Sequence, residues 1–259
     1  MSGTTMSGAP VAVITGAGSG IGRAIARELG GRGFLVVVTD VDGDAARAVA
    51  EDLDGWAAPL DVTDARAVAA LAEEVADRQG RLDVWVSNAG ISHMAPFTEV
   101  TLEELDRTLA INLRGVFVCG QAAARTMRRL GGGGAIVNLA SMAGKQGRVP
   151  YLSDYVASKF GVVGLTQAMA FELAADSIRV NCVCPGYVAT PMQDRELAWE
   201  AGLRGIAPED VREMWIADTP MGRLEQPEDV ARVVAFLAGP DAAFVTGEAV
   251  AVNGGAFMD

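Results

Sequence analysis

Short apolar runs rich in valine alternate along the chain with longer segments in which alanine, leucine and charged residues recur at helical spacing. The apolar runs predict seven strands: Val11–Ile14, Phe34–Thr39, Trp56–Leu60, Val84–Ser87, Ala135–Leu139, Arg179–Val183 and Ala249–Val252. The segments between them predict helices near Gly20–Gly30, Asp44–Leu53, Ala65–Gln79, Leu102–Leu130, Tyr155–Ala174 and Pro227–Leu237. Such alternation is typical of βα units that wind a parallel sheet. The sequence therefore predicts an α/β fold in which helices flank a doubly wound, seven-stranded parallel sheet.

No linker rich in proline or serine divides the chain, so we expect one dinucleotide-binding and catalytic domain over residues 1–259. The rhythm breaks only at Pro191–Pro220, which carries two short helical pieces and the tryptophans Trp199 and Trp215. Long insertions between core elements often form lids. We therefore interpret Pro191–Pro220 as a substrate loop whose tryptophans pack it onto the domain.

A glycine-rich turn, Thr15–Gly22, follows the first predicted strand and leads directly into a predicted helix. Glycines at such a turn let backbone N–H groups approach a pyrophosphate, whose charge the helix N-terminus stabilises. Asp40 follows the second strand, about 20 positions after the turn, where an acid that binds the adenosine ribose hydroxyls is expected. Its carboxylate repels a 2′-phosphate. The pattern predicts a Rossmann-type site that prefers NAD to NADP, with an exposed loop acid as the alternative interpretation of Asp40.

Residues at the ends of other predicted strands extend this site, because ligands of such sheets bind beyond the carboxyl ends of the strands. Asp61 and Val62 follow the third strand and Asn88-Ala89-Gly90 follows the fourth, although either group alone is also ordinary turn chemistry. From the glycine-rich turn itself we expect cofactor contacts from Gly16, Ser19, Gly20 and Ile21.

Tyr155-Val156-Ala157-Ser158-Lys159 opens a long apolar helical segment. Four residues make about one helical turn, so the side chains of Tyr155 and Lys159 lie on one face. A tyrosine with a pKa near 10 is a poor base at neutral pH, but a neighbouring ammonium group favours its phenolate form. The pair therefore predicts a general acid/base, against the alternative of a surface tyrosine beside a solvated lysine.

Two further polar residues support this interpretation. Ser141 directly follows the fifth strand, so its hydroxyl emerges at the sheet edge where a substrate is expected. Asn112 is a polar residue inside an otherwise amphipathic helix, where it either bonds the backbone and holds a water behind the lysine or satisfies a local carbonyl.

At this point the sequence resembles the short-chain dehydrogenase/reductase family over about residues 8–258. The resemblance is carried by Thr15–Gly22, Asp61, Asn88–Gly90, Asn112, Ser141, Tyr155–Lys159, Pro185–Gly186 and Thr190. It implies that Tyr155 is the acid/base, that Ser141 polarises the substrate oxygen, and that Lys159 binds the nicotinamide ribose and lowers the tyrosine pKa. It also implies a water-linked proton path at Asn112 and cofactor contacts from Tyr155, Lys159, Pro185, Gly186, Val188 and Thr190. The interval from Ser141 to Tyr155 is one residue longer than is usual in the family, and the extra length falls in Lys145–Ser153.

These residues predict hydride transfer between an alcohol carbon and nicotinamide, but they do not select the substrate. The segment after Pro191 resembles family members that act on sugar alcohols and small diols, so the leading hypothesis is an NAD-dependent polyol or secondary-alcohol dehydrogenase. The alternatives are a 3-oxoacyl-thioester reductase and an inactive NAD-binding scaffold. We expect substrate contacts from Ser141, His93, Gln146, Tyr187 and Met192.

The net charge of −12 argues against partners that carry phosphate, namely nucleic acids and anionic membranes. The three cysteines lack metal-ligand spacing, so we expect free thiols and no metal. The first ten residues have no leader-like pattern and no segment is long and apolar enough to span a bilayer, which favours a cytoplasmic location. Apolar residues on the two longest predicted helices exceed what one covered face requires, which indicates a homo-oligomer, and the family resemblance implies a homotetramer.

Overall fold

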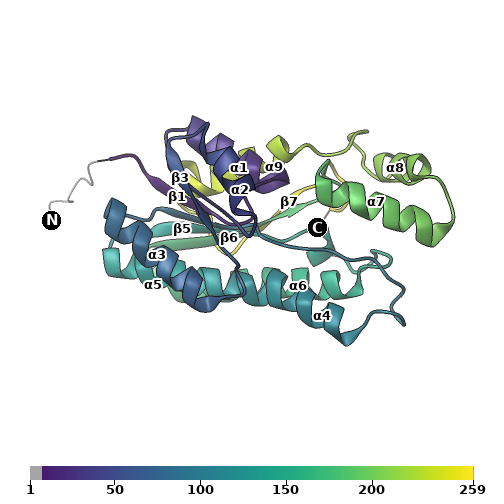
Figure 1. The fold of residues 1–259 in the computed structure, drawn as a ribbon, viewed down its shortest axis with the longest axis horizontal. Coiled ribbons are helices and arrows are strands. Elements are labelled where there is room, and N and C mark those ends of the chain that lie inside the picture. Colours follow the sequence, from purple (N-terminus) through teal and green to yellow (C-terminus); the bar gives the residue numbers. More distant parts are fainter. Residues whose placement is uncertain (1–7, 259) are drawn as a thin grey trace.

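A computed structural model of the chain describes residues 8–258. The start of the chain, in which we expected no leader, lies mostly outside the described residues. Figure 1 shows a central sheet between two layers of helices, with a further pair of helices beyond one end of the sheet. Within residues 8–258, no helix is both long and apolar enough to cross a bilayer.

The sheet contains seven parallel strands in the order β3-β2-β1-β4-β5-β6-β7. Their bounds are β1 Val11–Ile14, β2 Leu35–Asp40, β3 Gly55–Pro59, β4 Val84–Ser87, β5 Gly134–Leu139, β6 Ile178–Pro185 and β7 Ala249–Val252. This confirms the predicted Rossmann-like fold, with strand ends that differ by one or two residues from the predicted ones. From β1 the chain winds first toward β3 and then back toward β7, so a crevice is expected beyond β1 and β4, where the direction of winding reverses.

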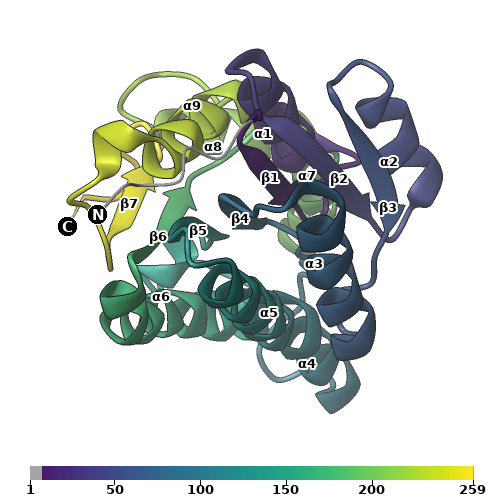
Figure 2. The ribbon, with the colours of Figure 1, turned by 90° about the vertical axis from the view of Figure 1, so that its left-hand side faces the viewer.

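Helices bury both faces of the sheet (Figure 2). Ile14 and Val38 belong to one buried cluster, against α1 (Gly20–Gly31), α2 (Gly43–Ala50) and α9 (Pro227–Ala238). Their chain neighbours Val13 and Val37 belong to the cluster on the opposite face, against α3 (Ala65–Gln79), α5 (Gly115–Leu130) and α6 (Ser153–Leu173). Burial on both faces explains why these strands are uninterrupted apolar runs. The three cysteines, Cys119, Cys182 and Cys184, are free and buried, as expected.

The helix predicted over Leu102–Leu130 is interrupted. The structure divides it into α4 (Leu102–Leu109), a π-helical turn over Ala110–Arg114, and α5. π-Helical turns widen a helix locally and are frequent at functional sites. The turn contains Asn112, whose contacts are described below.

The insertion Pro191–Pro220 contains two helices, as expected. It forms α7 (Pro191–Arg204) and α8 (Pro208–Ala217), which lie beyond one end of the sheet in Figure 1. The predicted packing role of Trp215 is confirmed, because its ring stacks on Tyr187 at 5.3 Å and its Nε1 donates to Glu200 Oε2 at 3.1 Å. These contacts fix α8 to α7 and to the segment that follows β6.

Candidate active site

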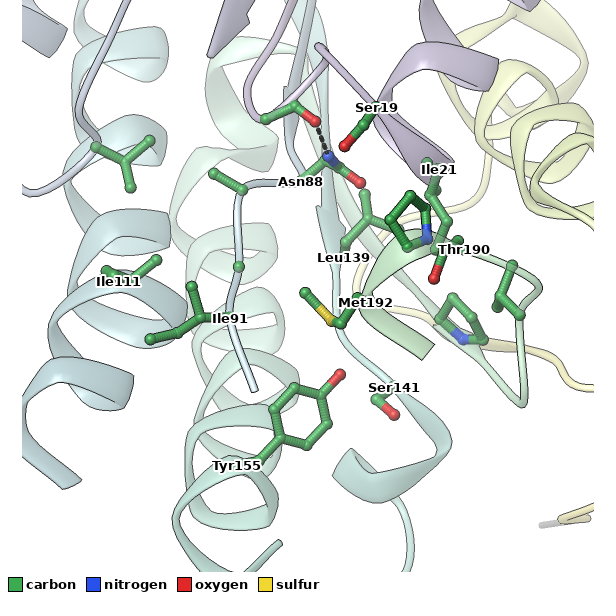
Figure 3. Close-up of a pocket in the computed structure, with 18 of the residues that line it drawn as sticks. Ser19, Ile21, Asn88, Ile91, Ile111, Leu139, Ser141, Tyr155, Thr190 and Met192 are labelled. Carbon is green, nitrogen blue, oxygen red and sulfur yellow. Dashed lines mark hydrogen bonds between the residues drawn. The ribbon is translucent and has the colours of Figure 1, made fainter. Parts of the chain in front are cut away.

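A cavity of about 670 Å³ lies at the carboxyl ends of the central strands. All of the residues expected to contact the cofactor line it: Gly16, Ser19, Gly20, Ile21, Asp40, Asp61, Val62, Asn88, Ala89, Gly90, Tyr155, Lys159, Pro185, Gly186, Val188 and Thr190. Ser141 and Met192 line it as well. Figure 3 shows part of this lining, with Ser19 and Asn88 at one side and Tyr155 and Ser141 at the other.

Hydrogen bonds hold the glycine-rich turn close to the segment that follows β4, which is a neighbour of β1 in the sheet. Asn88 Nδ2 donates to the carbonyl oxygens of Thr15 and Gly16, both at 2.9 Å. Gly16 has a φ of +62°, and a Cβ on it would lie 2.7 Å from the Cα of Ala89. Ser19, at the N-cap of α1, makes no capping hydrogen bond with its side chain. The amide groups of the first turn of α1 therefore suit a phosphate group.

Asp40 places a carboxylate at the rim of the same cavity. Its Oδ2 accepts the N–H of Gly18 at 2.9 Å and its Oδ1 accepts the N–H of Asp42 at 3.0 Å. A Cβ on Gly18 would lie 3.0 Å from Oδ2, so glycine permits this contact. The carboxylate is thus fixed to the glycine-rich turn while its remaining lone pairs are available to ribose hydroxyls.

Tyr155 and Lys159 lie one turn apart on α6. Lys159 is 4% exposed, and its Nζ donates to the carbonyl oxygen of Leu139 at 2.8 Å and lies 5.4 Å from the ring centroid of Tyr155. Ser141 Oγ accepts the N–H of Ala143 at 3.1 Å. In Figure 3 the ring of Tyr155 extends from α6 into the cavity, on the side where Ser141 and Met192 lie. A phenol hydroxyl, a serine hydroxyl and a lysine amino group therefore meet at one end of the cavity.

Burial has the largest effect on both titratable groups of this cluster. It raises the pKa of Tyr155 above its ordinary value, and the charge of Glu196 raises it further, whereas the Ser141 hydroxyl lowers it. Burial lowers the pKa of Lys159 to about 8. The family resemblance implies that Lys159 lowers the tyrosine pKa, but in the protein alone the pKa of Tyr155 is raised, because desolvation disfavours the phenolate.

Asn112 is fully buried and joins three elements. Its Oδ1 accepts the N–H of Ile91 at 2.8 Å, and its Nδ2 donates to the carbonyl oxygen of Ile91 at 2.8 Å and to Ser158 Oγ at 3.3 Å. The predicted bond to the backbone is thus present, but the partner is a distant segment after β4 rather than a local carbonyl. Asn112 does not itself line the cavity, and the predicted water-linked path stays a prediction.

Comparison with known proteins agrees with this geometry. A family model described as Enoyl-(Acyl carrier protein) reductase matches residues 16–256, which includes every element that lines the cavity. The chain belongs to the short-chain dehydrogenase/reductase family. It is an oxidoreductase of this family, and a nicotinamide dinucleotide is its cofactor type.

Three similar members of the short-chain dehydrogenase/reductase family span almost the whole chain. The cis-4-hydroxycyclohexanecarboxylate dehydrogenase of Sinomonas cyclohexanicum is 46% identical and covers 95% of each chain. The (3R)-3-hydroxyacyl-CoA dehydrogenase of Mus musculus is 41% identical and covers 96% of each. The crystal structure of a single-residue variant of actinorhodin polyketide ketoreductase with NADPH has a TM-score of 0.91 at 38% identity, and covers 96% of this chain and 97% of its own.

Of the residues expected to contact substrate, Ser141 and Met192 line the cavity, but His93, Gln146 and Tyr187 do not. Tyr187 is turned toward α8, where it stacks on Trp215 and its hydroxyl donates to Asp218 at 3.2 Å. His93 Nδ1 lies 3.5 Å from Glu104 Oε1, and its ring meets Trp199 edge-on at 5.7 Å. Both rings therefore pack against other side chains of the protein and do not form part of the cavity wall.

Sequence reasoning missed three polar residues of α7 that line the cavity, Gln193, Arg195 and Glu196. The three-residue spacing of Gln193 and Glu196 is the signal that was available, because it puts both on one helical face with Met192. Without the position of α7 in the fold, the sequence does not show that this face is turned toward the cavity. Within residues 8–258, no group of three or more His, Cys, Asp and Glu side chains is arranged to hold a metal ion.

Proposed function

We propose that this short-chain dehydrogenase/reductase is an NAD-dependent dehydrogenase that interconverts a secondary alcohol, of the polyol or diol class, and its ketone. The observation that carries the proposal is the shared cavity, which joins the Asp40 carboxylate at one end to Tyr155, Ser141 and Lys159 at the other. A cavity that joins a ribose-binding acid to an acid/base pair suits a dinucleotide that reaches from the adenosine site to the reacting carbon.

The residues present fit that cofactor. The amides of the first turn of α1 would hold the pyrophosphate, Asp40 the adenosine ribose, and Asp61 and Val62 the adenine. Asn88–Gly90, Lys159 and the segment Pro185–Thr190 would hold the nicotinamide riboside. When bound, the nicotinamide ring takes up or releases the hydride.

We assign the proton transfer of the reaction to Tyr155. During oxidation the alcohol proton passes to the Tyr155 oxygen as the C–H hydride leaves, and reduction is the reverse. Ser141 holds the substrate oxygen by a hydrogen bond. Because burial raises the pKa of Tyr155, the neutral phenol is the resting form, which suits proton donation to a ketone.

The test is an initial-rate assay of NADH absorbance across hexitols, pentitols, diols and simple secondary alcohols. Tyr155→Phe should lose nearly all activity, whereas the matched variant Tyr151→Phe, whose side chain does not line the cavity, should keep it. Failure of every alcohol to reduce NAD, or full activity in Tyr155→Phe, would overturn the proposal.

A second candidate is reduction of a 3-oxoacyl thioester. It is favoured by the similarity to the mouse (3R)-3-hydroxyacyl-CoA dehydrogenase and to the actinorhodin ketoreductase. Efficient reduction of acetoacetyl-CoA together with no oxidation of polyols or diols would select it. An inactive scaffold is the third alternative, and turnover of any substrate by the wild type eliminates it.

We also propose that the chain is a single domain, that it is cytoplasmic, and that it assembles as a homotetramer through α5 and α6. On these helices, three large apolar side chains are exposed: Phe117 by 50%, Phe160 by 45% and Phe171 by 90%. Exposed apolar side chains of this size support a face that another subunit covers. A monomer in light scattering would contradict the assembly.

A further inference from the structure

The α7 helix presents a carboxyl group to the reacting end of the cavity. Glu196 lines the cavity together with Ser141 and Tyr155, and its charge acts on Tyr155. Met192, one turn earlier on the same face of α7, lies above Tyr155 in Figure 3. Glu196 is therefore within the space that a substrate must occupy, although the family motifs do not include it.

A second polar group on the same face of α7 lacks a partner within residues 8–258. The hydroxyl of Ser92 does not line the cavity, and it lies beside the Glu196 carboxyl, whose pKa it lowers as a hydrogen-bond donor. On α7, the side chain of Gln193 is 7% exposed, lines the cavity, and has a buried Oε1 without a partner. Buried polar groups are normally satisfied, so unsatisfied ones at a cavity wall mark the position of a ligand's polar group.

The chemistry of these groups selects the kind of ligand. A carboxylate and the carbonyl oxygen of an amide side chain only accept hydrogen bonds. A substrate hydroxyl satisfies either of them, because it donates a hydrogen bond. A thioester carbonyl or a carboxylate offers only acceptors, and a carboxylate would also be repelled by Glu196.

We propose that the Glu196 carboxyl and the side-chain carbonyl of Gln193 form a subsite that binds a second, uncharged hydroxyl group of the substrate and disfavours an anionic group at the same position. The inference rests on the proposed function, since it concerns the alcohol that Tyr155 deprotonates. Burial raises the pKa of Glu196 above its ordinary value, and the adjacent Arg195 and the Ser92 hydroxyl oppose this. Protonated or not, the carboxyl group hydrogen-bonds a hydroxyl, but only the charged form repels an anion.

Arg195 is the competing determinant. It is exposed on α7 and also lines the cavity, so it is the group that would attract a carboxylate. The structure favours Glu196 because the Glu196 carboxyl is withdrawn from solvent, where charges act more strongly than at the exposed Arg195.

The test compares three alcohols that share one reacting carbinol and differ at the opposite ring carbon: cyclohexanol, cis-cyclohexane-1,4-diol and cis-4-hydroxycyclohexanecarboxylate. For the wild type, kcat/KM with NAD should be at least about ten-fold higher for the diol than for cyclohexanol, as expected for a hydrogen bond to a charged group. The carboxylate should be the poorest of the three.

Glu196→Leu should bring the ratio of diol to cyclohexanol close to one while cyclohexanol itself is still oxidised. Glu196→Gln should keep part of that ratio and raise kcat/KM for the carboxylate. Asp194→Asn, which removes a carboxylate from the exposed face of the same helix, is the matched control and should change none of these ratios.

The outcomes separate the two proposals. Oxidation of all three alcohols with ratios that Glu196→Leu leaves unchanged overturns the subsite and leaves the proposed function intact. A wild type that prefers the carboxylate, with that preference lost in Arg195→Gln, also overturns it in favour of anion recognition. Failure to oxidise any of the three, or any alcohol of the wider panel, overturns the proposed function itself.

Discussion

Asp40 gives the sharpest prediction because both of its oxygens are held in place by the backbone. The perturbation is Asp40→Asn, which preserves the shape of the side chain and removes its charge. Oδ2 and Oδ1 accept the N–H groups of Gly18 and Asp42. In the variant the amide nitrogen is a donor, so it cannot accept one of these two N–H groups. This weakens the glycine-rich turn for both dinucleotides. The ratio of kcat/KM for NAD to that for NADP therefore reports on the charge alone.

The size of the effect on that ratio follows from two contributions. Two like charges at contact repel by about 1 kcal/mol in water and about 4 kcal/mol near a protein surface, so at this half-exposed site the charge costs NADP about 2 kcal/mol. Replacing charged by neutral hydrogen bonds to the ribose costs NAD about 1 kcal/mol. The total of about 3 kcal/mol corresponds to about two decades in the NAD to NADP ratio of kcat/KM, at about 1.4 kcal/mol per decade.

The assay is initial-rate kinetics with one alcohol and both dinucleotides, for the wild type, Asp40→Asn and Asp44→Asn. Asp44 is an exposed acid on α2 that pairs with Arg47, so its variant controls for the general loss of charge. The ratio should fall about 100-fold in Asp40→Asn only. A wild type that prefers NADP, or a ratio that changes by less than about three-fold in Asp40→Asn, would refute the reasoning.

Three more predictions concern Asn112, Trp215 and Lys159. Asn112→Leu should leave two half-buried polar groups of Ile91 without their partner, which costs up to about 1–3 kcal/mol each, and should lower both kcat and the melting temperature, whereas a loss of kcat with unchanged stability would point to the predicted water path alone. Trp215→Phe keeps an aromatic ring but removes the indole N–H that donates to Glu200 Oε2, so KM for the alcohol should rise several-fold while KM for NAD changes little; an equal rise in both would contradict a role confined to α7 and α8. Burial lowers the pKa of Lys159 to about 8, below the value of about 10.4 for an unfolded chain, so between these values only the unfolded state binds the proton and stability rises with pH. Urea titration of the cofactor-free protein should show the wild type gaining about 2 kcal/mol relative to Lys159→Met between pH 8 and pH 10, and a flat or falling difference would contradict the lowered pKa.

The sheet and the cofactor side of the cavity were predictable because short-range rules govern them. A parallel strand buried on both faces is a continuous apolar run, so Leu35–Asp40 was recognisable from its valines alone. The glycine-rich turn was recognisable because a positive φ at Gly16 and the close approach of Ala89 exclude other residues. Such constraints act on the backbone and limit which residue types can occupy a position, so they are visible in the sequence.

The interruption of the helix at Ala110–Arg114 was not predictable in the same way. Asn112, within this turn, makes two hydrogen bonds to Ile91, which is distant in the chain. The local pattern of Leu102–Leu130 remains that of an amphipathic helix, so periodicity gives no sign of the π-helical turn. A buried asparagine in that pattern was the only visible signal.

The substrate side is harder to predict because side-chain pairing decides which residues face the cavity. Tyr187 and His93 follow the same strands as the cofactor residues, yet their rings contact Trp215 and Trp199 of the insertion. The insertion therefore removes two aromatic side chains from the cavity and supplies Glu196 in their place. We therefore predict that exchanging the cavity face of α7 alters alcohol preference, while the NAD to NADP ratio of kcat/KM, for which Asp40 is the proposed determinant, stays the same.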